Sequence, residues 1–386
     1  MNNFESRFKV IRHALNNPLI NAMLSEYYGK TSSPSADLIY EVFGAGAEND
    51  FCGAVQGILL RDDNAFSKAC AKDGNCSEYL KFAYLQDLNT LFKITEHFYN
   101  SNDFSYGAPL PVFKAKTDAQ LIERLREFYA KNGYGILIGN RAFEYRGGEI
   151  YPMTGISDIT LSQLKDYETE KKAVTDNVKD FLSGLPYSHM LLYGDRGTGK
   201  SSTVNAVLNE FYDSGLRLVE IGKEELHGIK QLKQTLSALP LKYIVFIDDI
   251  SLSEQEMPST LKAAVEGSVT EARNVMIVAT SNRRHIVKES FSERENSVHP
   301  SDGIEEQLSL SDRFGLTVMF STTGKREYLS IVRQLAGDLS LTTPVTDLEA
   351  LAERWAILNG GRSPRKARQF TDFVYACEKS GRPIEF

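Results

Sequence analysis

The chain has 386 residues, a length that favours two or three domains over one. Lysine and arginine number 44 against 51 aspartates and glutamates, so the net charge of −7 excludes a global basic field that would hold a nucleic-acid backbone. Hydrophobic content of 42% and charged content of 25% exclude a disordered or fibrous chain. Residues 1–5 lack the basic and apolar stretches of a signal peptide, and the longest apolar run, 51–60, is about half of a bilayer span. We therefore expect a cytoplasmic protein with no membrane partner.

Residues 1–156 are expected to form a mostly helical N-terminal domain with a short hairpin. Apolar residues recur at helical spacing in 8–15, 80–94 and 121–128. A β pattern follows, from the apolar run 136–138 into a hairpin over 142–151 that turns at two glycines, and we expect it to close this domain. No spacing typical of catalytic residues occurs in 1–155, so the sequence predicts no chemistry there.

Residues 157–323 alternate short apolar runs with helical patterns, which is typical of a parallel α/β sheet. The expected fold class is therefore α/β, with a five-stranded parallel sheet. The candidate strands are strongly apolar, as strands covered on both faces should be: 189–193, 216–221, 243–247, 275–279 and 316–320. Residues 324–386 predict a helical C-terminal domain, with helices over 325–339, 347–358 and 364–379.

A glycine-rich segment directly follows the first of these strands and precedes a helical pattern. It fits GxxxxGK[ST] in full, through Gly194, Asp195, Arg196, Gly197, Thr198, Gly199, Lys200 and Ser201. Glycines let successive backbone N–H groups turn toward phosphates, and the helix N-terminus adds partial positive charge. Lys200 would reach the β and γ oxygens, and Ser201 would supply a hydroxyl to Mg²⁺. The sequence therefore predicts a phosphate-binding loop, called the phosphate loop below.

Two carboxylates, Asp248 and Asp249, directly follow the apolar strand 243–247. Ligands of open α/β folds bind at the carboxyl ends of the strands, so these acids are expected at the site. Asp248 is predicted to hold the Mg²⁺ shell and Asp249 to polarise the attacking water. The alternative is an acidic strand end that caps the next loop.

Three further residues follow a strand, precede the last strand or begin a helix. Asn282 is predicted to orient water and sense the γ-phosphate, with a turn cap as the alternative. Arg313 is placed to stabilise charge on a transferring γ-phosphoryl group in a neighbouring subunit, with an ion pair to a nearby acid as the alternative. Arg365, at the start of the last helix, is predicted to reach back to the nucleotide; a nucleic-acid patch on this arginine cluster is the competing interpretation.

These elements, in this order, make residues 157–386 resemble the AAA+ ATPases. More narrowly, the motifs at 192–202, 246–249, 279–284 and 308–316 look like an uncharacterised bacterial AAA+ family known as domain of unknown function 815. The resemblance implies that the phosphate loop extends through Ser202 and that Asp248 and Asp249 are the Walker B acids. It implies a sensor 1 role for Asn282, an arginine finger at Arg313 and a sensor 2 role for Arg365. It also implies that Tyr167, before the first core helix, contacts adenine.

The leading interpretation is an AAA+ ATPase that binds ATP with Mg²⁺ and hydrolyses it to drive conformational change or remodelling. The resemblance implies a homo-oligomeric ring or partial ring, such as a hexamer, and an unknown protein partner at the N-terminal domain. Many members of the AAA+ class have glutamate where this chain has Asp249. A nucleotide-controlled binding switch with negligible turnover is therefore one alternative, and a DNA-associated loader or remodeller is another.

Overall fold

The structure is a computed structural model, and it describes residues 5–29, 35–72, 76–100, 105, 107–250, 261, 264–265, 273–282 and 314–386. It divides into two compact units. The helical unit comprises Met1–Asn140 with Leu239–Leu241, and the sheet unit comprises Arg141–Ala238 with Lys242–Phe386.

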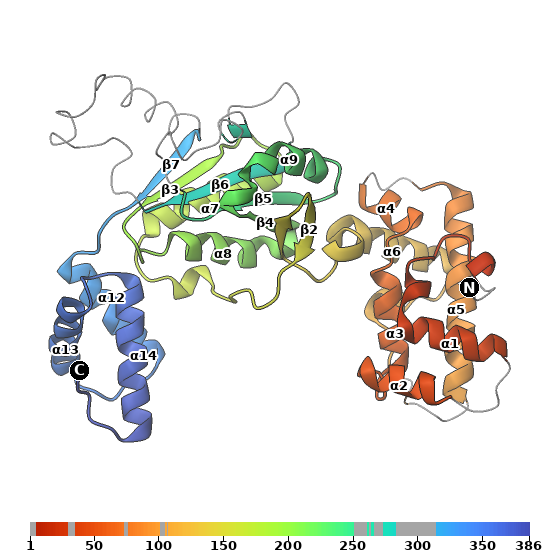
Figure 1. Ribbon diagram of the computed structural model, residues 1–386, viewed down its shortest axis with the longest axis horizontal. Helices are drawn as coiled ribbons and strands as arrows, with labels where there is room; N and C mark the ends of the chain where they lie inside the picture. Colours follow the sequence, from red (N-terminus) through yellow and green to blue (C-terminus); the bar gives the residue numbers. More distant parts are fainter. Residues whose placement is uncertain are drawn as a thin grey trace. The chain divides into compact units, whose positions relative to one another are not determined.

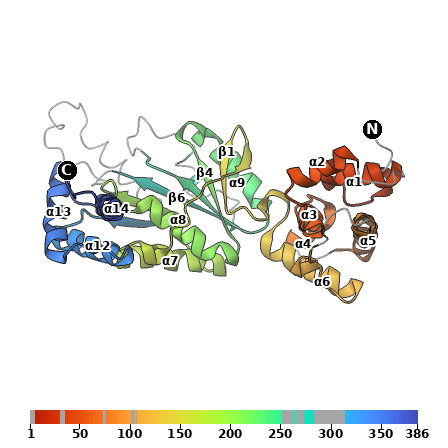
Figure 2. The same ribbon diagram turned by 90° about the horizontal axis from the view of Figure 1, so that it is seen from below.

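The helical unit is built from helices around one apolar core, as the spacing of its apolar residues predicted. The helices are α1 (Pro18–Gly29), α2 (Ala36–Gly44), α3 (Phe51–Leu60), α4 (Ala65–Lys72), α5 (Glu78–Asn100) and α6 (Asp118–Asn132). Figure 2 views α3 and α5 nearly end on, with α1 lying across them. Side-chain caps fix several helix starts: Asp50 accepts from the Gly53 N–H at 2.9 Å and Thr117 accepts from the Gln120 N–H at 3.2 Å.

Two local predictions for this unit are wrong. The spacing of Phe8, Ile11 and Leu15 predicted a helix, but the chain there has only short 3₁₀ turns at Glu5–Arg7 and Ala14–Asn16. All three side chains are nevertheless buried, so the apolar spacing indicated which residues are buried but did not indicate a helix. The predicted strand at 136–138 is largely a 3₁₀ turn, Gly135–Leu137.

The sheet unit contains, among the described residues, one seven-stranded sheet in the order β2-β1-β4-β5-β6-β3-β7. Its strands are β1 (Ala142–Arg146), β2 (Glu149–Pro152), β3 (Met190–Gly194), β4 (Leu216–Ile221), β5 (Lys242–Ile247), β6 (Val275–Ser281) and β7 (Leu316–Phe320). The last five are the predicted strands, and every pairing among them is parallel. The predicted α/β class is confirmed, with two more strands than expected.

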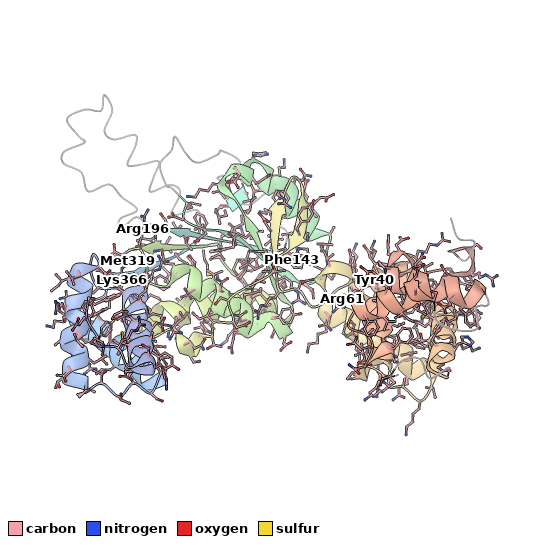
Figure 3. The ribbon with its side chains drawn as sticks, turned by 60° about the horizontal axis from the view of Figure 1, so that its bottom comes forward. Tyr40, Arg61, Phe143, Arg196, Met319 and Lys366 are labelled. Carbon is pink, nitrogen blue, oxygen red and sulfur yellow. The ribbon has the colours of Figure 1, made fainter. Side chains whose placement is uncertain are left out.

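The additional strands are the β1–β2 hairpin, whose predicted place was wrong. It was expected to close the helical domain before residue 157, but β1 pairs in parallel with β4 and so extends the sheet. Figure 3 labels Phe143 on β1, and this residue lies beside Val219 of β4 in the register. The boundary between the units therefore falls after Asn140 and not after residue 156.

Helices cover both faces of the sheet. Figure 1 shows α7 (Glu168–Ser183) and α8 (Lys200–Phe211) on one face and α9 (Ile229–Ser237) on the other. Val178 of α7 and Val207 of α8 pack in one apolar cluster with strand residues such as Ile244. The strands are apolar on both sides for this reason.

Residues 324–386, called the lid below, form α12 (Lys325–Asp338), α13 (Val345–Leu358) and α14 (Pro364–Ser380). The lid has an apolar cluster of its own, although its contacts make it part of the sheet unit. Ser363 caps α14 by accepting from the Lys366 N–H at 3.3 Å, and Pro364 occupies the first turn. None of the helices in the described part of the chain has both the length and the apolar character needed to span a bilayer.

Candidate functional site

The polar residues singled out by the sequence surround a cavity of about 620 Å³ in the sheet unit. The cavity lies at the carboxyl ends of β5 and β6, beside the start of α8, and the lid lines it as well. From the predicted set, it is lined by Tyr167, Arg196, Gly197, Thr198, Gly199, Lys200, Ser201, Ser202, Asp248, Asp249, Asn282 and Arg365. Figure 3 labels Arg196 in the phosphate loop and Lys366 at the start of α14.

The phosphate loop joins β3 to α8 and depends on glycine at points of close approach. Gly194 has φ +130°, and a Cβ there would lie 2.0 Å from the Phe320 carbonyl oxygen of β7. Gly197 has φ +78°, and a Cβ there would lie 3.1 Å from the Arg365 Cβ of the lid. Because α8 begins at Lys200, its free N–H groups and helix dipole face the same cavity, an arrangement that favours an anion.

Lys200 is held by three oxygen atoms. Its Nζ donates to the carbonyls of Gly194 at 3.0 Å and Asp195 at 2.7 Å, and to Asn282 Oδ1 at 3.1 Å. Burial lowers the pKa of Lys200 below its ordinary value, against the raising effect of nearby carboxylates. A bound polyphosphate would favour the charged form further, so this lysine is preorganised for an anionic ligand.

The two acids after β5 are both drawn into this network. Ser201 Oγ donates to Asp248 Oδ1 at 2.7 Å, and Asn282 Nδ2 donates to Asp249 Oδ1. Asn282 therefore connects Lys200 to Asp249 through its two amide atoms. The backbone of Asp249 has φ +54°, an uncommon conformation for a residue other than glycine.

The donor set fits a magnesium ion. Mg²⁺ prefers oxygen ligands, commonly one or two carboxylates together with substrate phosphates and waters. Ser201 and Asp248 supply a hydroxyl and a carboxylate 2.7 Å apart, and both line the cavity beside Lys200. These are the residues that would hold the ion.

The lid contributes arginines with different partners. The Arg365 backbone N–H donates to the Gly197 carbonyl at 3.2 Å, which ties the start of α14 to the phosphate loop. Arg365 and Arg368 both line the cavity. Arg362, from the same sequence cluster, is instead paired with Glu353 of α13 at 2.7 and 2.9 Å.

Tyr167 lines the cavity with a largely buried side chain. Its side chain is 9% exposed, and its ring lies 5.3 Å from that of Phe320. Its hydroxyl donates to the Ser321 carbonyl at 2.7 Å, in the segment between β7 and α12. Apolar side chains beside it in the lining, Ile331 and Leu335 of α12, offer an additional surface for a base.

Other predicted residues lie elsewhere. Within the phosphate loop, all of which is described, Gly194 and Asp195 are absent from the cavity lining. Their carbonyls hold Lys200, and the Asp195 carboxylate accepts from Thr322 Oγ1. Arg313 lies outside the described residues.

The sequence analysis gave no role to Thr280, which also lines the cavity. It lies near the end of β6 and bonds to both acids. Strand alternation was the available signal, because Thr280 and Asn282 are two residues apart and share a face.

The sequence matches one family model and stretches of larger relatives. The model described as "Protein of unknown function (DUF815)" matches residues 139–378. The AAA-ATPase At5g57480 of Arabidopsis thaliana is 28% identical over 149 residues, which are 34% of this chain and 27% of that protein. The probable mitochondrial chaperone BCS1-A of Dictyostelium discoideum is 26% identical over 168 residues, 38% of each. The chain thus matches only between a quarter and two fifths of these relatives' length.

Solved structures also match parts of this chain. The Thermotoga maritima RuvB Holliday junction branch migration motor has a TM-score of 0.39 and 18% identity, over 58% of this chain and 66% of that one. The FIGL-1 AAA domain in complex with ADP has a TM-score of 0.40 and 19% identity, over 57% of this chain and 75% of that one. The sequence matches, the phosphate loop and the sheet observed here confirm the predicted AAA+ P-loop core.

Proposed function

We propose that this chain, which belongs to the DUF815 family, binds ATP with Mg²⁺ in the cavity beside the phosphate loop and hydrolyses it. The observation that carries the proposal is the connection from Lys200 through Asn282 to Asp249. A cation and a carboxylate bond to the two sides of one amide, which supports a role for the cation at the β and γ oxygens and for the carboxylate at the attacking water. Phosphoryl transfer needs this kind of positioning and charge stabilisation more than covalent chemistry.

Each residue has a distinct role in this proposal. Lys200 and the N–H groups at the start of α8 offset charge on the phosphates. Ser201 and Asp248 hold the magnesium ion, which neutralises charge on the β and γ oxygens when bound. Asp249 accepts a proton from the attacking water or polarises it, and Asn282 keeps that carboxylate in place.

The lid supports coupling of the nucleotide to conformational change. Arg365 reaches the cavity from α14, and its backbone bonds to the phosphate loop at Gly197. We propose that nucleotide loss releases this contact and lets the lid move, in a homo-oligomer whose arginine finger is Arg313. The work would be passed to a protein partner bound by the helical unit.

The test is steady-state phosphate release from Mg-ATP at increasing protein concentration, with Lys200→Ala as the blank. Specific activity above the blank that rises with concentration supports hydrolysis at a site completed between subunits. Arg313→Ala should then lower the rate about 10³-fold or more while leaving ATP binding intact. Release indistinguishable from the blank, with no measurable ATP binding, contradicts the proposal.

A binding switch with negligible turnover is the second candidate. One observation favours it: the short Asp249 side chain is engaged by the Asn282 amide, which occupies one of its oxygens. Tight ATP binding with near-zero phosphate release at every protein concentration would select this alternative.

A further inference from the structure

Thr280 of β6 bonds to both Walker B acids, although neither the sequence analysis nor the proposed mechanism gives it a role. Its Oγ1 donates to Asp248 Oδ1 at 2.6 Å and accepts from the Asp249 backbone N–H at 2.8 Å. Its carbonyl accepts from the Ile250 N–H at 2.7 Å. One residue on a neighbouring strand therefore holds three consecutive residues at the end of β5.

The register of the sheet puts Thr280 in this position. Ile247, the last residue of β5, lies opposite Ala279 of β6, so Thr280 of β6 lies beside Asp248 at the point where β5 ends. Thr280 is only 1% exposed, so its hydroxyl is directed to protein groups and the cavity and not to bulk water.

The backbone conformation of Asp249 depends on these bonds to Thr280. A φ of +54° costs free energy for a residue with a Cβ and persists where surrounding contacts impose it. The bonds from Asp249 N–H and Ile250 N–H to Thr280 are contacts of that kind. This turn directs the Asp249 carboxylate to Asn282.

We infer that Thr280 is a positioning residue for ATP hydrolysis, an inference that rests on the proposed function. Its hydroxyl orients the Asp248 carboxylate next to Ser201 and fixes the turn that presents Asp249 to water. The role needs a donor and an acceptor on one atom, which a hydroxyl provides and a methyl group does not. Thr280→Val keeps the shape and removes both bonds, whereas Thr280→Ser keeps both bonds.

The experiment compares these two variants with the unmodified protein and with Thr95→Val. Thr95 is a matched control because it is equally buried, in α5 of the helical unit, and its hydroxyl bonds only within its own helix or to Met23. Each protein is assayed for phosphate release, for ATP affinity with Mg²⁺ and with EDTA, and for its melting temperature.

We expect Thr280→Val to lower kcat about 10- to 100-fold, the effect of losing a hydrogen bond to a charged group. ATP affinity in EDTA should stay within about twofold, because the phosphate loop is unchanged. Thr280→Ser and Thr95→Val should retain kcat within about threefold. A larger loss of Mg²⁺-dependent than of EDTA affinity in Thr280→Val would add support.

Wild-type kcat in Thr280→Val overturns the inference, and so does an equal loss in Thr280→Ser, since the hydroxyl would then not matter. If Thr280→Val does not fold, Thr280→Ala is judged by the same criteria. If the unmodified protein releases no phosphate, the hydrolysis proposal fails separately. The role of Thr280 is then tested by how much Mg²⁺ strengthens ATP binding in each variant. A smaller gain in Thr280→Val than in Thr280→Ser supports the role, and an equal gain overturns it.

Discussion

Charged side chains in the two units differ in what they bond to. In the helical unit, Asp87 of α5 is 2% exposed, and its carboxylate accepts from the backbone N–H groups of Lys9, Val10 and Ile11. In the sheet unit, Lys200 and Asp249 bond to the same amide and line a cavity. The first carboxylate is satisfied by the fold itself. The second group of charges remains next to a space that a ligand can fill.

This contrast separates a structural charge from a functional one. Three successive N–H groups make a concave anion site, and in the helical unit the chain's own aspartate occupies it. At the start of α8 the comparable N–H groups face a cavity of about 620 Å³. We therefore expect substitutions at Asp87 to change stability and substitutions around the cavity to change nucleotide chemistry.

The largest expected effect is that of Asp249→Asn. The amide keeps the shape of the side chain but cannot accept a proton from water, so phosphate release should fall about 10³-fold. ATP affinity should change little, because the phosphate loop is intact. Phosphate release and ATP titration check this, and Asp347→Asn, a substitution of an exposed residue, is the control. An unchanged rate would remove Asp249 from the chemistry.

The second effect is on stability. Asp87→Ala leaves the N–H groups of Lys9, Val10 and Ile11 without their acceptor, so the free energy of unfolding of the helical unit should fall by about 3 kcal/mol. Hydrogen exchange at these amides measures the change, with Asp118→Ala on the exposed start of α6 as the control. Altered ATP affinity in Asp87→Ala would contradict the claim that this carboxylate has a purely structural role.

The third effect depends on pH. Burial lowers the pKa of His189 to about 4, and its Nδ1 accepts from the Ile277 N–H at 3.1 Å. The unfolded chain takes up a proton near the ordinary value, so the unfolding free energy of the sheet unit should fall by about 2 kcal/mol between pH 7 and pH 5. Urea unfolding followed by Trp355 fluorescence should show this. His189→Asn, which keeps an acceptor, should remove that part of the pH dependence; an unaltered pH profile would contradict the assignment.

The smallest effect compares two arginines of the lid. Arg365→Ala should weaken ATP binding about tenfold, because it removes a cation that lines the cavity. Arg362→Ala removes the same charge from the same cluster but breaks only the pair with Glu353, so ATP affinity should stay within about twofold. Equal losses in isothermal titration would mean that net charge, and not position, attracts the nucleotide.

The sequence predicted the parts of the molecule in which local pattern and burial agree. The strands from β3 to β7 are mainly apolar, and polar residues follow β5, so both the strands and the edge that carries Asp248 could be inferred. The β1–β2 hairpin was recognised but misplaced. Alternating apolar residues around a glycine turn predict that β1 and β2 pair with each other. They do not predict that β1 also pairs with β4.

Side-chain partners from distant parts of the chain were the least predictable. The bond from Tyr167 to Ser321 spans more than a hundred positions, so nothing local in the sequence predicted it. Arg362 and Arg365 look alike in sequence, and only the fold shows that Glu353 faces the first. The bonds of Thr280 to Asp248 and Asp249 gave no sequence signal, because they depend on the pairing of β5 with β6.

The β1–β2 hairpin also determines where the nucleotide-binding part of this chain can be cut. The predicted boundary would start a fragment at residue 157 and leave the N–H and C=O groups along one side of β4 without their β1 partners. An unprotected strand edge is a template for self-association. A fragment starting at residue 139, where the family match begins, keeps that edge covered. The hairpin thus covers β4 and leaves β2, a strand of four residues that ends in a proline, as the edge strand on this side of the sheet.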